Sequence, residues 1–178
     1  MIIASLAALV LNILWVPVID PITHHKYGHI NQYTVLILSV SMPFLYFNNF
    51  LWTINFAKGR LKMIFYVFLI SFLFNLIGDV VLIPFFKAEG AAVAYLVAII
   101  VQSVLYFRQT KLEGLKHHSS SILLCPLFAI ISGMLAIVFF HVAWMILFSA
   151  LVFYFLFLVF TKQIRFSDWF VFKRITGL

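Results

Sequence analysis

The chain has 178 residues, of which 65% are hydrophobic and only 10% are charged, and its mean hydropathy is +1.15. Soluble domains are typically about half apolar and a quarter charged, so this composition excludes an ordinary soluble domain and indicates an integral membrane protein. The formal charge of +7 does not indicate a nucleic-acid partner, because the basic residues lie between apolar runs instead of forming one patch.

Six apolar runs have roughly the length that a helix needs to cross a bilayer, which is about 20 residues. In chain order they are 2–19, 33–57, 63–85, 91–107, 122–140 and 144–161. The runs are continuous and lack the alternation of outer-membrane β-strands, so we expect an all-α integral membrane fold with six transmembrane helices. Residues 1–178 then form a single transmembrane region, and residues 162–178 are its cytoplasmic tail.

The basic residues between the runs predict how the chain is oriented. Three stretches carry ten of the twelve Lys and Arg residues and alternate with stretches that hold only Lys26 and Lys87. By the positive-inside rule, the basic stretches and both termini lie in the cytoplasm. Four basic residues are candidates for contact with lipid head groups on that side: Lys58, Arg60, Lys62 and Arg108. Topology alone also explains their placement.

The stretch between the first two runs is rich in histidine, with His24, His25 and His29 following Asp20. Histidines in such a cluster can bind a metal ion or respond to pH. Because no cysteine and only one carboxylate is close in sequence, we favour a solvated loop. The single cysteine, Cys125, excludes an intramolecular disulfide, and we expect neither a metal nor a cofactor.

Polar residues inside the runs are few and share helical faces. Asp79 is the only acidic residue within a predicted span, where a charge costs about 2.5–3.5 kcal/mol unless it has a partner or water. Asn75 lies one turn before it, Asn48 and Asn55 are seven residues apart, and Gln102 continues a face of small residues. All five are candidates for a substrate or ion pathway. The alternative is structural: hydrogen bonds that only hold the helices together.

The stretch 75–98, NLIGDVVLIPFFKAEGAAVAYLVA, resembles the polysaccharide flippases of the multidrug/oligosaccharidyl-lipid/polysaccharide exporter superfamily. In these proteins an Asn-containing helix ends in Leu-Ile-Pro, an aromatic-glycine turn follows, and Gly-Ala-Ala opens the next helix. The matching positions here are Asn75, Asp79, Leu82-Ile83-Pro84 and Gly90-Ala91-Ala92. Lys87 departs from the pattern, because glycine is usual in the turn at that position.

The resemblance covers most of residues 31–177 and matches only the C-terminal lobe of a two-lobed exporter. It implies a multi-pass protein of a bacterial or archaeal cytoplasmic (inner) membrane that moves a lipid-linked oligosaccharide for cell-surface polysaccharide or lipopolysaccharide biosynthesis. The implied partners are membrane lipids, the lipid-linked oligosaccharide, and an N-terminal lobe or partner subunit.

Two other functions stay open at this point. One is a cation-coupled multidrug exporter of the same superfamily, in which Asp79 is the coupling carboxylate. The other is a membrane segment, left by truncation, that transports nothing. The sequence carries no catalytic pair of carboxylates, Ser/His/Asp set, phosphate-binding glycine loop or HExxH spacing, so we do not expect an enzyme.

Overall fold

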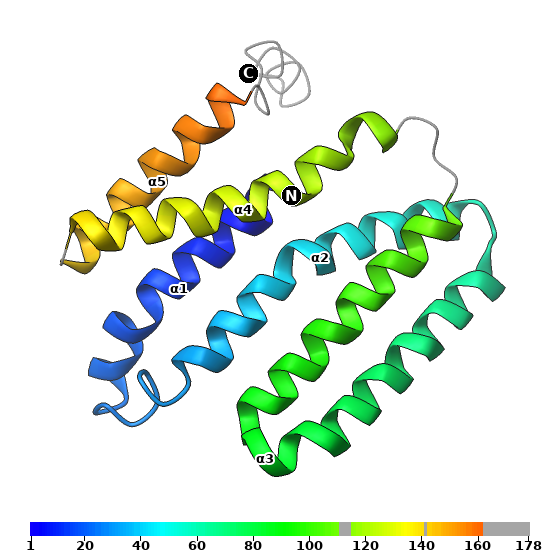
Figure 1. Cartoon of the computed structure of the whole chain (residues 1–178), viewed down its shortest axis with the longest axis horizontal. Coiled ribbons are helices and arrows are strands. Elements are labelled where there is room, and N and C mark those ends of the chain that lie inside the picture. Colours follow the sequence, from blue (N-terminus) through cyan, green and yellow to red (C-terminus); the bar gives the residue numbers. More distant parts are fainter. Residues whose placement is uncertain (111–114, 141, 162–178) are drawn as a thin grey trace.

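The computed structural model describes residues 1–110, 115–140 and 142–161, and of residues 115–123 it describes only the backbone. Within these ranges all of the regular secondary structure is helical, without a strand. The helices are α1 (Ile2–Ile22), α2 (Gln32–Ala57), α3 (Leu61–Gln109), α4 (Leu115–Phe139) and α5 (Ala143–Phe160) (Figure 1). The predicted cytoplasmic tail, residues 162–178, lies outside the described residues.

Four of the described helices, α1, α2, α3 and α5, are long and apolar enough to cross a membrane. The prediction of an all-helical chain suited to a membrane is therefore confirmed. The 49 residues of α3 form two arms, 61–86 and 88–109, which fold back on each other at Lys87 (Figure 1). With these arms counted separately, six helical segments overlap the six predicted runs. That all six cross the membrane, with both termini in the cytoplasm, stays a prediction.

Two helices extend several residues beyond the apolar runs from which they were predicted. α1 continues beyond residue 19 to Ile22, and α4 begins at Leu115 instead of residue 122. The reason is that helical hydrogen bonding does not stop where an apolar run stops, since it also satisfies the backbone of the polar residues that follow. As a consequence Asp20 belongs to α1, and Asp79 is not the only acidic residue within a long apolar helix.

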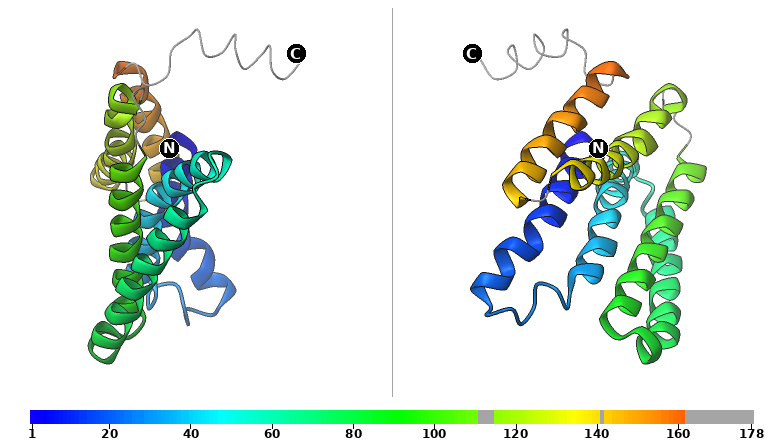
Figure 2. Two further views of the ribbon diagram at one scale, coloured as in Figure 1. Left: turned by 90° about the vertical axis from the view of Figure 1, so that its right-hand side faces the viewer. Right: turned by 60° about the vertical axis from the view of Figure 1, so that its left-hand side comes forward.

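The described helices are arranged in a row. α3 packs only on α2, α2 packs on α1 and touches α4, and α1, α4 and α5 all pack on one another. The α3 hairpin therefore lies at one edge of the row and α5 at the other (Figures 1 and 2). Two groups result, α2–α3 and α1–α4–α5, and the α1–α2 interface is the main joint between them.

Each group of helices has its own buried cluster. The cluster of α2 and α3 consists of Phe47, Leu51, Ile64, Val67 and Tyr106. The cluster of α1, α4 and α5 consists of Leu9, Cys125, Phe128, Ala129, Ala136, Ala150, Tyr154 and Leu158. Large apolar side chains such as Phe65, Phe72 and Phe148 remain exposed on the outer faces, which suits a surface that contacts lipid.

The turn of the α3 hairpin is tighter than the predicted connecting stretch from Pro84 to Gly90. Helical geometry persists on both sides, and only Lys87 leaves it, with φ 51° and ψ −125°. These angles match the first central position of a type II′ turn, which favours glycine because a side chain is strained there. Glycine would adopt these angles without strain, because it has no Cβ.

We expect Lys87→Gly to stabilise the chain by about 1 kcal/mol. A side chain held in this region costs about 1–3 kcal/mol, and the greater freedom of glycine in the unfolded chain removes roughly 0.5–1 kcal/mol of the gain. The free energy of unfolding in detergent micelles, followed by circular dichroism, measures the change. Lys87→Ala is the matched control, because it removes the same charge and keeps the strain. Equal stabilities of the two variants would contradict the expectation.

Candidate functional site

The polar side chains of α2 form one buried face. Ser41, Asn48 and Asn55 follow one another at seven-residue spacing, which is close to two helical turns. Their exposed fractions are 3%, 2% and 0%. Because α3 is the main neighbour of this part of α2, the buried amides of Asn48 and Asn55 are directed toward α3.

Two hydrogen-bonded contacts connect this face to the second arm of α3. Asn48 Nδ2 donates to the carbonyl oxygen of Ile99 at 3.2 Å and to Gln102 Oε1 at 3.3 Å. Asn55 Nδ2 donates to Thr110 Oγ1 at 2.7 Å and to the Leu51 carbonyl at 2.8 Å. Three of the five predicted pathway residues, Asn48, Asn55 and Gln102, therefore lie between helices and bond across the interface.

The other two predicted residues form a separate pair on the first arm of α3. Asn75 Nδ2 donates to Asp79 Oδ2 at 3.1 Å, and both side chains are half-buried. The adjacent Gly78 lies close to the second arm, since a Cβ added there would be 2.8 Å from the Cβ of Ala94. Within the described chain, Asp79 forms no ion pair. Its carboxylate therefore relies on one neutral amide donor in a helix suited to the membrane.

Several polar atoms around these contacts have no hydrogen-bond partner within the described chain: Asn48 Oδ1, Asn55 Oδ1, Asn75 Oδ1 and the Tyr106 hydroxyl oxygen. A buried polar atom without a partner costs about 1–3 kcal/mol. Hydroxyl or amide donors from a ligand or from another polypeptide would satisfy the three amide oxygens. The arrangement can thus bind polar groups, although the two sets of residues do not touch each other through any hydrogen bond.

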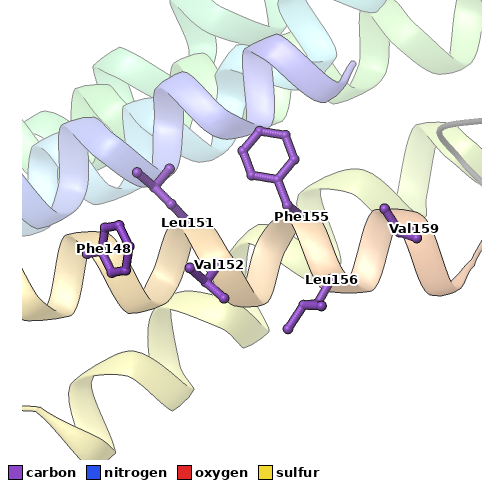
Figure 3. Close-up of a pocket in the computed structure, with 6 residues that line it drawn as sticks. All are labelled: Phe148, Leu151, Val152, Phe155, Leu156 and Val159. Carbon is purple, nitrogen blue, oxygen red and sulfur yellow. The ribbon is translucent and has the colours of Figure 1, made fainter. Parts of the chain in front are cut away.

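One open hollow of the surface lies on α5, a helix that packs on neither α2 nor α3. An apolar groove of about 430 Å³ follows α5 and is lined by Phe148, Leu151, Val152, Phe155, Leu156 and Val159 (Figure 3). All six side chains come from one helix, so the groove is shallow and open to the surroundings. Its chemistry suits a hydrocarbon chain and offers no polar contact.

The four predicted head-group contacts gather at one end of the α2–α3 pair. Lys58, Arg60 and Lys62 are exposed around the α2–α3 turn, and Arg108 is exposed in the last turn of α3. The hydrogen bond from Asn55 to Thr110 holds the two helix ends together. Because the sequence has no acidic residue between Asp20 and Asp79, this end is strongly basic and suits anionic phosphates.

The fold brings together one set of side chains for which the sequence favoured only a solvated loop. Asp20 is buried at the end of α1, and its carboxylate lies within 4 Å of ring nitrogens of His25 and His29. Both histidines are exposed, as expected of a solvated loop, but the loop folds back onto α1. The sequence holds one sign of this contact: Gly28 follows Asp20 in the same stretch and is small enough to let the loop approach the carboxylate. Among the described residues, no group of three His, Cys, Asp or Glu is spaced to hold a metal ion.

Comparison with protein-family models, with curated proteins and with solved structures found no match to this chain.

Proposed function

We propose that this chain is one helical lobe of a membrane exporter that moves a lipid-linked oligosaccharide across the inner membrane. The resemblance of residues 75–98 to polysaccharide flippases first suggested this function. The row-like arrangement of the helices supports it, since the two edges and outer faces of the row are free to pack on a second lobe. A pathway between two such lobes needs polar groups for the sugar, cations for the phosphates and an apolar surface for the lipid tail.

The observation that carries the proposal is the Asn75–Asp79 pair. Both side chains lie in an apolar helix whose exposed neighbours include Leu76, Ile77 and Val80. A half-buried carboxylate without a cation, next to an amide oxygen without a donor, is costly in hydrocarbon. The cost falls if this part of α3 borders a water-filled path, where sugar hydroxyls can donate to both oxygen atoms.

Two further surfaces fit the same substrate. The basic end formed by Lys58, Arg60, Lys62 and Arg108 suits the phosphates of a lipid carrier, and the apolar groove of α5 suits its hydrocarbon chain. These surfaces lie on different helix groups, so one lipid-linked molecule would contact them at different stages of its passage. They support the proposal less strongly than Asp79, because membrane phospholipids have the same chemistry.

Asp79→Asn is expected to lower oligosaccharide export roughly tenfold, which corresponds to about 1.4 kcal/mol in the transport barrier. The substitution keeps the size of the side chain and removes its charge and half of its acceptor capacity. The measurement is the surface polysaccharide of bacteria that lack their own flippase and express this chain together with the N-terminal lobe of a polysaccharide flippase, normalised to the chain present in the membrane.

Glu89→Gln is the matched control, since it neutralises an acidic residue of the same helix near the hairpin tip, and we expect it to leave export unchanged. Wild-type export by Asp79→Asn would contradict a role for Asp79. Absence of export when the unaltered chain and the second lobe are both in the membrane would contradict the proposed function itself.

A cation-coupled multidrug exporter is the second candidate, and the same carboxylate favours it. A carboxylate with no ion pair in the described chain can exchange a proton or a metal cation during a transport cycle. In that case dye efflux driven by a proton or sodium gradient depends on Asp79, survives in Asp79→Glu and is lost in Asp79→Asn. A chain that supports neither dye efflux nor oligosaccharide export is a membrane segment that transports nothing.

A further inference from the structure

The carboxylate of Asp20 is covered by the turn between α1 and α2. Its Oδ2 atom lies 3.6 Å from His25 Nδ1 and 3.5 Å from His29 Nε2, and its Oδ1 atom accepts a hydrogen bond from the His29 backbone N–H at 3.3 Å. The Asp20 side chain is 6% exposed, whereas those of His25 and His29 are 81% and 70% exposed. The anion is therefore buried, and the two imidazoles beside it are exposed to water.

The turn is shaped to hold this contact. Gly28 is buried against Asp20, and a Cβ at that position would overlap the Oδ1 atom. The indole N–H of Trp15 donates to the Gly28 carbonyl at 3.1 Å, which ties the turn to α1. His24 and His25 have φ angles of 52° and 60°, a region that side chains other than Asn, Asp and His seldom adopt. Specific contacts thus hold the turn closed.

No other cation of the described chain competes for the carboxylate, since its ion pairs are those with the two histidines. Lys26 points elsewhere, with Nζ 5.7 Å from the centre of the Tyr27 ring, and His24 is exposed. The helices packed on α1 add four titratable side chains in their described parts, and none of them hydrogen-bonds to Asp20: Tyr33, Tyr46, Cys125 and Tyr154.

We propose that Asp20, His25 and His29 form a proton-sensitive clasp that holds the α1–α2 turn closed when the histidines are protonated. A protonated imidazole is attracted to the buried carboxylate, so the clasp is tightest when both rings carry a proton. When the histidines lose their protons this attraction is lost, and the backbone hydrogen bond of His29 remains.

The clasp lies at the end of the α1–α2 interface, so its effect extends from the turn to that interface. α1 and α2 form the main joint between the two groups of helices, and the side chains of Asn12 and Ser39 hydrogen-bond across the same joint. A closed clasp fixes the end of this joint, and an open one leaves the two groups free to change their relative orientation. The clasp thus couples the pH on one side of the membrane to the joint, whether or not the chain is an exporter.

The indole of Trp15 is a direct reporter of the clasp, because it hydrogen-bonds to the turn. We expect the ¹⁹F resonance of 5-fluorotryptophan at position 15, assigned with Trp15→Phe, to shift between pH 8 and pH 5 in the full chain reconstituted in lipid nanodiscs. The shift is expected to shrink in His25→Asn and in His29→Gln, and to vanish in the double variant and in Asp20→Asn. Asparagine is chosen at position 25 because it tolerates positive φ.

His24→Asn is the matched control, since His24 lies in the same turn at positive φ and forms no ion pair with Asp20. It is expected to keep the full pH response. A wild-type resonance that does not move, a response that persists in the double variant, or a response lost in His24→Asn would overturn the proposal. So would a response that a chelator abolishes, because a metal ion would then be the switch.

Unchanged resonances of the other tryptophans exclude global unfolding, and the single variants decide the question if the double variant unfolds.

Discussion

A methyl group added at Gly90 is expected to destabilise the chain by about 1–3 kcal/mol, because it has no room beside the backbone of the opposite arm. Gly90 is buried just after the turn of the α3 hairpin. A Cβ at this position would lie 2.5 Å from the carbonyl oxygen of Leu82 and 3.1 Å from the backbone nitrogen of Ile83. Backbone atoms cannot turn aside as a side chain can, so Gly90→Ala forces the two arms apart at their tip.

The free energy of unfolding in mixed detergent micelles measures this effect, and Gly133→Ala provides the control. A Cβ at Gly133 would lie 3.1 Å from Leu9 Cδ1, the end of a flexible side chain, and the substitution gains about 0.8–1.0 kcal/mol of helix propensity. We therefore expect Gly133→Ala to be neutral or slightly stabilising. If Gly90→Ala behaved in the same way, the close approach of the two arms at the tip of α3 would be wrong.

The helical segments were predictable because a membrane leaves few alternatives. Continuous apolar runs can satisfy their backbone in hydrocarbon only as helices, and this constraint acts locally. The seven-residue spacing of Asn48 and Asn55 also sufficed to predict that they share a face, since helical periodicity alone decides it. The sequence predicted a connecting stretch of several residues where the structure has a break at Lys87 alone. The stretch was overestimated because both arms stay helical up to that residue.

The partners of the candidate site could not be predicted from spacing. Asn48 meets Gln102 across 54 positions of the chain, and Asn55 meets Thr110 across 55. Such contacts depend on which helix packs on which, and apolar faces in a membrane carry little information about that choice. The clasp at Asp20 was missed for a related reason: α1 extends beyond its apolar run, so the carboxylate is buried where a loop residue was expected.

The polar residues within the helices fall into two groups, one that connects helices and one that does not. Asn48, Asn55 and Gln102 donate or accept across α2 and α3, as residues that hold helices together do. Asn75 and Asp79 bond only to each other within one arm, so their hydrogen bond does not stabilise any contact between helices. We therefore assign the stronger functional proposal to Asp79 and expect the amides of α2 to contribute mainly to stability.

Because Asn55 is assigned a structural role, we expect Asn55→Ala to destabilise the chain by about 1–2 kcal/mol. Interhelical hydrogen bonds in membrane proteins contribute about 0.6 kcal/mol on average and up to about 1.7 kcal/mol, and the lost packing at a fully buried position adds to this. Asn49→Ala is the control, because Asn49 is an exposed amide of the same helix and its removal should change stability by less than about 0.5 kcal/mol. Denaturant titration of both variants in the same micelles measures the difference.

The contact itself is isolated by combining Asn55→Ala with Thr110→Val. Because the Asn55 amide and the Thr110 hydroxyl lie 2.7 Å apart, the double variant should lose less stability than the sum of the two single losses. Additive losses would mean that the two side chains do not stabilise each other. If, in addition, Asn55→Ala were as stable as Asn49→Ala, the α2 amides would have no structural role to explain their burial, and a polar pathway between α2 and α3 would become the better explanation.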